Sequence, residues 1–280
     1  MLPARNPPPG PGNHLSEWHI GGSNAPTTCS KIGSTATNPM ALHFSTGNAK
    51  LNKNTLIFNL PAGKTCPGAM FCKSMAIATP EGRKIADGPH TEFRCFAASS
   101  EVQYDAVFYN RAENLQQIID ALKAGNCADL INTELHKNLK KKHTRVRIHE
   151  SGDFFNAAYL QAWVMVAIAN PSIDFYCYSK SLNLFVGLEL PSNFYLTASY
   201  GGKFDHLIDE GVFPRYTKVV QSVEDADTLG LPVDVDERHC FTPGPFAILV
   251  HGTQPKGTAW GKAARVNRTV KKELRAALGV

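Results

Sequence analysis

Short apolar segments alternate with amphipathic ones along most of the chain after residue 54. Six segments are rich in β-branched and aromatic residues, are bounded by turn residues and are predicted to be strands: 55–60, 145–149, 173–178, 193–199, 216–220 and 246–251. Apolar residues at helical spacing predict helices over 113–123, 128–141, 155–169, 223–229 and 259–278, with shorter helices after residues 181 and 204. Strands that alternate with helices favour parallel pairing through right-handed crossovers. We therefore expect an α/β fold, a partial (β/α)6 TIM-like barrel with mostly parallel strands; an open doubly wound sheet is the alternative.

Three regions fall outside this alternation. Residues 1–40 are rich in Pro, Gly and Asn without a sustained period, which predicts an extended N-terminal arm. Residues 40–54 are expected to be loop-like before the first strand, and residues 73–94 to form a surface excursion. Residues 41–280 are then expected to form a single α/β domain, long enough to bury a sizeable core.

The charge balance, the lack of long apolar segments and the cysteine count argue against membrane-spanning, secreted and disulfide-rich proteins. Lys and Arg exceed Asp and Glu by 29 − 24 = +5, partly through basic runs at 137–143 and 262–275. Such runs are usually solvated helix faces, and contact with nucleic acid or phosphate is the alternative. No segment approaches the roughly 18 apolar residues that span a bilayer, and no signal sequence is visible at the N-terminus. Seven cysteines, an odd number, favour a reducing compartment, so we expect a soluble cytoplasmic protein without a disulfide framework.

Polar residues directly follow several of the predicted strands. Folds with parallel strands bind their ligands at these positions. In such folds these positions share one rim, at the carboxyl ends of the strands. The residues are Cys66 and Cys72 after the first strand, His149, Glu150 and Asp153 after the second, Tyr178 and Lys180 after the third, and His251 after the sixth. We expect the site on this rim.

Cys66, Cys72 and Cys95 are the candidate metal ligands. Pro and Gly residues between the first two let both thiolates face a common centre. Their wide, irregular spacing favours an iron-sulfur cluster over a zinc site, and three ordinary buried cysteines are the plain alternative. Cys240 is the best fourth thiolate, because the long turn-rich linker 231–245 can carry it toward the rim. Cys29 lies in the arm, and Cys127 and Cys177 are expected to be structural.

The second strand carries a basic set of side chains. Arg145, Arg147 and His149 share one face by strand alternation, and the apolar residues between them should meet the helices. An inward-facing basic set is costly to bury without compensation. Either Glu150 and Asp153 pair with it, or an anion or a metal site does.

Several motifs together resemble one known family. At 58–69, Cys72, 94–97, 147–154 and 175–181 the sequence is similar to the bacteriophage gene product 88 family, over roughly residues 47–251. Its cysteine pattern is similar to that of radical SAM proteins, whose cluster thiolates follow the first strand of a partial barrel of six units. The resemblance implies an iron-sulfur cluster, 4Fe-4S, held by Cys66, Cys72 and Cys95, with Cys240 matching a cysteine region before the last strand. This chain separates its third cysteine by residues 73–94 and lacks the tight three-cysteine motif of radical SAM enzymes.

The function expected from these features is redox chemistry. We predict a phage-encoded iron-sulfur protein of the host cytoplasm, serving electron transfer or another redox reaction with an unknown redox partner or small anionic substrate. Cofactor-binding residues are expected to be Arg147, His149, Tyr178 and Lys180, and candidate catalytic residues are His149, Asp153 and Lys180. One alternative is a binding module, stabilised by zinc or a cluster, for nucleic acid or a host protein. Another is a SAM-dependent radical enzyme, which requires an open iron.

Overall fold

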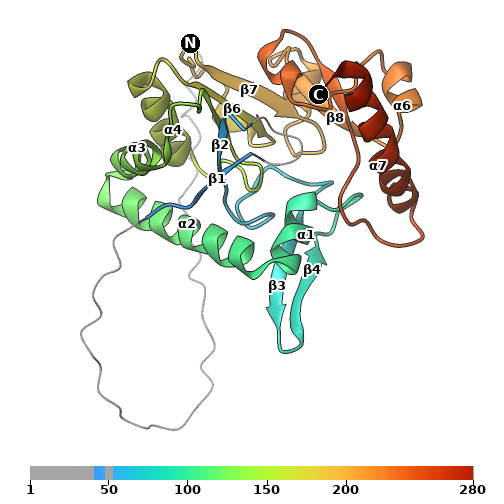
Figure 1. The fold of residues 1–280 in the computed structure, drawn as a ribbon, viewed down its shortest axis with the longest axis horizontal. Helices are drawn as coiled ribbons and strands as arrows, with labels where there is room; N and C mark the ends of the chain where they lie inside the picture. Colours follow the sequence, from blue (N-terminus) through green and yellow to red (C-terminus); the bar gives the residue numbers. More distant parts are fainter. Residues whose placement is uncertain (1–40, 48–52, 280) are drawn as a thin grey trace, which may run out of the picture. The chain divides into compact units, whose positions relative to one another are not determined.

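A seven-stranded sheet forms the centre of the protein in the computed structural model, which describes residues 41–47 and 53–279 (Figure 1). Its strands, in spatial order, are β1 (Phe44–Thr46), β2 (Thr55–Phe58), β5 (Arg145–Ile148), β6 (Asp174–Ser179), β7 (Phe194–Ser199), β8 (Tyr216–Val220) and β9 (Phe246–Leu249). β1 is antiparallel to β2, and every later pair is parallel. The six parallel strands lie in chain order, without the reversal of order that marks a doubly wound sheet.

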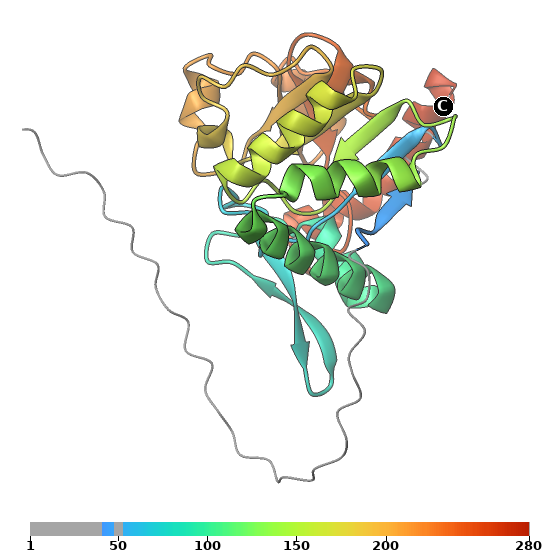
Figure 2. The same ribbon diagram turned by 90° about the vertical axis from the view of Figure 1, so that its left-hand side faces the viewer.

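The three helices between residues 105 and 169 cover one face of this sheet. The helices are α1 (Phe96–Gln103), α2 (Asp105–Ala124), α3 (Cys127–Asn138), α4 (Ala157–Ala169), α5 (His206–Asp209), α6 (Val223–Thr228) and α7 (Ala259–Leu278), with 3-10 turns η1 (Leu182–Leu184) and η2 (Arg238–Phe241). Figure 2 shows α2, α3 and α4 side by side against the sheet. Trp163 of α4 is fully buried there, with its ring 5.4 Å from that of Phe58 and 6.3 Å from that of Phe175. The apolar positions of these segments therefore build the main core.

Strand alternation assigns the two faces of the sheet. Val146 and Ile148 of β5 and Cys177 of β6 pack into the core beneath α3 and α4. Arg147 of β5 and Tyr178 of β6 point to the opposite face, where they line a cavity. This division follows the expected period of two, so both the apolar outer face and the helix-facing position of Cys177 are confirmed.

The predicted class, a mixed α/β fold with a mostly parallel central sheet, is confirmed. The sheet is not closed, because β1 and β9 remain at its two ends. The expectation that residues 40–54 are loop-like is corrected, since residues 44–46 pair with β2. The surface excursion is a hairpin, β3 (Ser74–Thr79) and β4 (Gly82–Asp87), whose two strands form a sheet of their own (Figure 1). The short helix expected after residue 181 is a single 3-10 turn.

Two predictions concern parts of the chain other than the sheet. No helix in the described ranges is both long and apolar enough to cross a membrane. The predicted arm, residues 1–40, and Cys29 within it lie outside the described residues.

Candidate ligand cavity with three cysteines

A cavity of about 860 Å³ opens at the carboxyl ends of the parallel strands. Its floor is the inner face of the sheet, with Arg147 of β5, Tyr178 of β6, Val219 of β8 and Ile248 of β9. Side chains of α1, α2 and α7 complete the wall. The polar residues expected on the rim therefore line one partly open cavity, of the size that small-molecule ligands occupy.

The loop with Cys66 and Cys72 is fixed by the backbone of the loop after β7. The N–H groups of Met70 and Phe71 donate to the carbonyl oxygen of Gly201 at 3.0 and 2.9 Å. A Cβ atom on Gly68 would lie 2.2 Å from the carbonyl oxygen of Lys180, a distance that no side chain tolerates. Gly68 thus allows the cysteine loop to lie directly on the chain that leaves β6.

Cys95 is held by a segment far away in sequence. The side-chain oxygen of Gln254 accepts the Arg94 N–H at 2.7 Å, and its amide nitrogen donates to the Arg94 carbonyl at 2.8 Å. Gln254 is nearly buried, so this paired contact sets the backbone just before Cys95. Cys95 itself is the N-cap of α1. The loop after β9 therefore positions the third cysteine.

The structure brings Cys66, Cys72 and Cys95 together at the cavity wall. Burial, the Asp153 carboxylate and the thiols of Cys95 and Cys72 raise the pKa of Cys66. Burial and the neighbouring Cys72 raise the pKa of Cys95 to about 11, against the opposing effect of the first amides of α1 and of Arg111. Each of these residues is partly exposed to the cavity, and the described cysteines form no disulfide. The three cysteines of the predicted triad therefore lie near one another in the structure.

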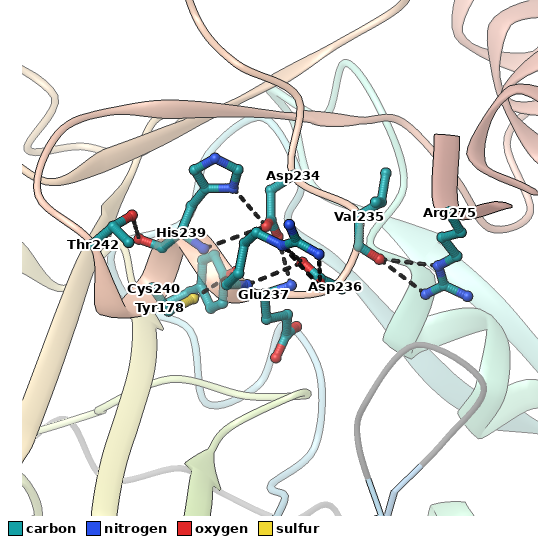
Figure 3. Close-up of polar contacts among 10 residues, drawn as sticks. Tyr178, Asp234, Val235, Asp236, Glu237, His239, Cys240, Thr242 and Arg275 are labelled. Atoms are coloured by element: carbon teal, nitrogen blue, oxygen red, sulfur yellow. Dashed lines mark hydrogen bonds and ion pairs between the residues drawn. The ribbon is translucent and has the colours of Figure 1, made fainter. Parts of the chain in front are cut away.

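Cys240 lies apart from that group. It is fully buried on the inner face of the sheet, packed with Tyr176 and Phe246 beneath the cavity. Its thiol lies 2.9 Å from the hydroxyl of Tyr178, and Figure 3 shows both side chains beside the 234–242 segment. Tyr178 lines the cavity and Cys240 does not. Among the described residues, no group of three or more His, Cys, Asp and Glu side chains is arranged to hold a metal ion.

Asp153 and Lys180 tie two strand ends together. The Asp153 carboxylate accepts from the Ser179 hydroxyl at 2.7 Å, the Lys180 N–H at 2.8 Å and the Phe154 N–H at 2.7 Å. Burial raises the pKa of Asp153, against these hydrogen bonds, which lower it. The Lys180 ammonium donates to the hydroxyl of Ser199. Asp153 thereby positions the backbone on which the cysteine loop rests, and the Lys180 side chain remains on the cavity wall.

Arg147 is neutralised by a residue that the sequence did not indicate. Its guanidinium forms an ion pair with Glu237, which is almost fully buried and also accepts from the Tyr176 hydroxyl at 2.8 Å. Pairing of the basic set with carboxylates is one of the two alternatives that the sequence leaves open, and for Arg147 the carboxylate in the ion pair is that of Glu237. Tyr176, Tyr178 and Glu150 raise the pKa of Arg147. Burial itself acts to lower that pKa, and the surrounding acidic groups outweigh it. A left-handed turn at Glu237 (φ 67°) aims the carboxylate inward, and no local pattern predicts this.

His149 does not share the face of Arg147 as expected. The strand ends at Ile148, and His149 adopts a left-handed conformation (φ 69°) that turns its ring toward α4. Its Nε2 atom lies 2.8 Å from the Tyr159 hydroxyl, and its ring lies 4.8 Å from that of Phe154. Burial and the Arg147 charge lower the pKa of His149 to about 3, so the ring is neutral. His149 still reaches the cavity wall.

The basic face of α7 is a wall of the cavity. Arg268, Lys271, Lys272 and Arg275 all line it, at helical positions i, i+3, i+4 and i+7. The opposite side of α7, with Val270 and Leu274, packs on the core cluster of β8 and β9. We expected the basic run 262–275 to be a solvated face, so the sequence missed this role. The i, i+3, i+4, i+7 spacing of the four cations is the signal that could have indicated it.

These features define a mixed α/β protein with a cysteine-bearing cavity at the carboxyl ends of six parallel strands. The family model described as gene product 88 matches residues 40–272. The chain therefore belongs to the gene product 88 family, and the resemblance seen in the cysteine and Gly-Asp motifs is confirmed. No curated protein and no solved structure gives a significant match to the chain.

Proposed function

We propose that this protein is an iron-sulfur protein, with a 4Fe-4S cluster bound by Cys66, Cys72 and Cys95 in a radical-SAM-like partial (β/α)6 barrel. The observation that carries the proposal is the meeting of these three cysteines at the wall of one large cavity. The strands of the sheet follow chain order, as successive βα units do when they curl into such a barrel.

The donor set fits a cluster. Thiolates are the usual ligands of iron-sulfur clusters. Burial and Cys72 raise the pKa of Cys95, and the first amides of α1 and Arg111 partly offset this. A cluster contains several irons, so its cysteines bind different atoms and stand further apart than the ligands of a single ion. The three thiols do not need to converge on one point.

We propose that the fourth iron of the cluster faces the cavity. Cys240 lies on the far side of Tyr178, with its thiol against that hydroxyl, so three thiolates suffice without a rearrangement of the sheet floor. An open iron position would face a bound small molecule. Cys240 remains the alternative fourth ligand, and a single variant separates the two arrangements.

The cluster would supply one-electron chemistry to whatever occupies the cavity. Around it, Arg147 and Lys180 supply positive charge and His149 a neutral ring. A small anionic substrate, or the acidic group of a redox partner, is the ligand that these side chains suit. The protein's own task is to orient that ligand and to exclude water from the site.

Anaerobic reconstitution with iron and sulfide tests the proposal. The wild-type protein should become brown, with a broad visible absorbance band and stoichiometric iron and sulfide. The variants Cys66→Ala, Cys72→Ala and Cys95→Ala should each lose most of the band, because each removes one ligand. Cys127→Ala, at the start of α3 in the core, is the matched control and should retain it.

Two outcomes decide the details. Retention of the band in Cys240→Ala supports an open fourth iron, whereas its loss assigns Cys240 as a ligand. A colourless protein that binds zinc with the same three cysteines would overturn the cluster and favour the zinc-stabilised binding module.

A further inference from the structure

The cavity has a strong excess of positive charge. Arg268, Lys271, Lys272 and Arg275 contribute from α7, and Arg94, Arg111, Arg147 and Lys180 contribute from the other walls. The lining acids are Glu150, Asp153 and Glu237. Asp153 accepts three hydrogen bonds and Glu237 pairs with Arg147, and the positive side chains of the wall outnumber its acids.

Some of these cations form no ion pair with an acid among the described residues. Arg94 pairs with Asp87 and Arg111 with Glu101, outside the cavity lining. Within the described parts of the chain, no ion pair involves Lys180, Arg268 or Lys272. Like charges gathered around a partly enclosed space attract anions of several charges.

Two buried side-chain atoms of residues that line the cavity also lack hydrogen-bond partners among the described residues. One is Nδ1 of His149, a residue only 3% exposed, and the other is Nε of Arg147, a residue 8% exposed. Leaving a buried polar group without a partner destabilises the protein, so such atoms mark places where a ligand gains from binding. Both residues line the cavity.

Both of these atoms are donors. Arg147 Nε always carries a proton. For His149, the fully buried Tyr159 hydroxyl needs an acceptor, and His149 Nε2 lies 2.8 Å away. If Tyr159 donates to Nε2, the proton of the neutral ring is on Nδ1, whereas the other tautomer leaves the Tyr159 proton without that acceptor. Each of these N–H groups therefore lacks an acceptor among the described residues.

We propose that the cavity binds a phosphorylated small molecule of nucleotide size, with a di- or triphosphate group against Arg268 and Lys272. Acceptor atoms in the rest of the molecule are placed near His149 Nδ1 and Arg147 Nε. The cavity volume, about 860 Å³, lies in the range of pockets for such ligands. This inference deepens the proposed function and rests on it for the use of the cavity as the site, but the phosphate contacts do not involve the cysteines.

Isothermal titration of the full-length protein with ATP and with pyrophosphate tests the proposal. Both should bind, and adenosine should bind much more weakly than ATP because it lacks the phosphates. The double variant Arg268→Ala/Lys272→Ala should weaken ATP binding by about tenfold or more, since charge-assisted hydrogen bonds are lost. Both residues are exposed on α7, so the fold should persist.

A matched variant distinguishes direct contact of Arg268 and Lys272 with the phosphates from the effect of the net positive charge of α7. Lys262→Ala/Arg265→Ala removes one Lys and one Arg from exposed positions of the same helix that do not line this cavity. It should change ATP affinity by less than about twofold, the effect expected of screened, distant charges. An equal loss in both double variants, or no loss in either, would overturn the proposal.

Two further measurements keep this inference separate from the cluster. Cys66→Ala without iron should bind ATP as the wild-type protein without iron does, so failure to form a cluster does not imply failure to bind phosphate. A single-stranded oligonucleotide that binds more tightly than ATP, and that loses affinity equally in both double variants, would instead assign α7 to nucleic acid.

Discussion

His149 shows how one backbone angle changes the role of a side chain. By strand alternation it belongs with Arg147, but the left-handed conformation after β5 buries its ring against Tyr159 and Phe154. A neutral buried histidine disfavours folding at acidic pH, because the unfolded chain binds a proton that the folded protein does not. Its position therefore makes the stability of the protein depend on pH.

The pH dependence has a definite sign. The pKa of His149 is about 3 in the folded protein and about 6.5 when unfolded, so its effect is absent above pH 6.5 and grows as the pH falls toward 3. At pH 5 it should cost about 2 kcal/mol of unfolding free energy. Urea unfolding of wild type and His149→Asn between pH 8 and pH 5 measures this, since Asn tolerates the left-handed backbone.

The comparison of two proteins isolates the histidine. The raised pKa of Asp153 acts in the opposite direction, stabilising the fold as the pH falls, but it is present in both proteins and cancels in the difference. His136→Asn, which changes an exposed histidine on α3, is the control and should behave as the wild type does. Parallel pH profiles for wild type and His149→Asn would contradict the assignment.

At the scale of elements, Glu101 connects three parts of the cavity wall. Its carboxylate oxygen accepts from the Ala62 N–H at 2.8 Å in the cysteine loop and from Arg111 of α2 at 2.9 Å. It also accepts from the Ser151 hydroxyl at 3.3 Å in the loop after β5. Both charged side chains are almost fully buried, so neither can be solvated if the other is removed.

Removal of Glu101 should therefore be severe. Glu101→Ala leaves the Arg111 guanidinium buried without its carboxylate and should cost about 3–5 kcal/mol in urea unfolding. The double variant Glu101→Leu/Arg111→Met should cost less than the sum of the two single changes, because no charge is left unpaired. Asp105→Ala, which breaks the exposed pair with Arg83, should cost less than about 1 kcal/mol. If the loss of unfolding free energy in the double variant equals the sum of the losses in the two single variants, Glu101 and Arg111 do not stabilise each other.

Elements with a strong local pattern were predictable, and those defined by distant partners were not. The helix predicted from about residue 259 to 278 is confirmed. A threonine cap and a final glycine mark its ends in the structure. β1 is three residues long and partly exposed, so it carries almost no periodic signal and exists through its pairing with β2. The site shows the same contrast. The place of Cys66 and Cys72 on the cavity wall follows from strand order, whereas Cys95 depends on the distant Gln254. The pairing of Arg147 with Glu237 likewise joins residues 90 positions apart.

At the scale of the whole molecule, the cysteine segments depend on loops from the second half of the chain. Gly201 binds the loop of Cys66 and Cys72, and Gln254 binds the backbone before Cys95. By contrast, α3 and α4 pack on the outer face of the sheet and touch none of these contacts. A group bound by the three cysteines would thus stabilise the cysteine segments and the loops that hold them more than it stabilises α3 and α4.

Hydrogen exchange can locate that stabilisation. A ligand that binds only the folded protein raises its stability, and the effect is largest where local opening would release the ligand. Reconstitution with iron and sulfide should therefore raise Tm by several degrees and slow exchange of the amides of Phe71 and Ala97, with little change in α3 and α4. Cys95→Ala should abolish both effects, whereas Cys127→Ala should retain them. Protection spread evenly over both faces of the sheet would place the bound group elsewhere than at the cysteine triad.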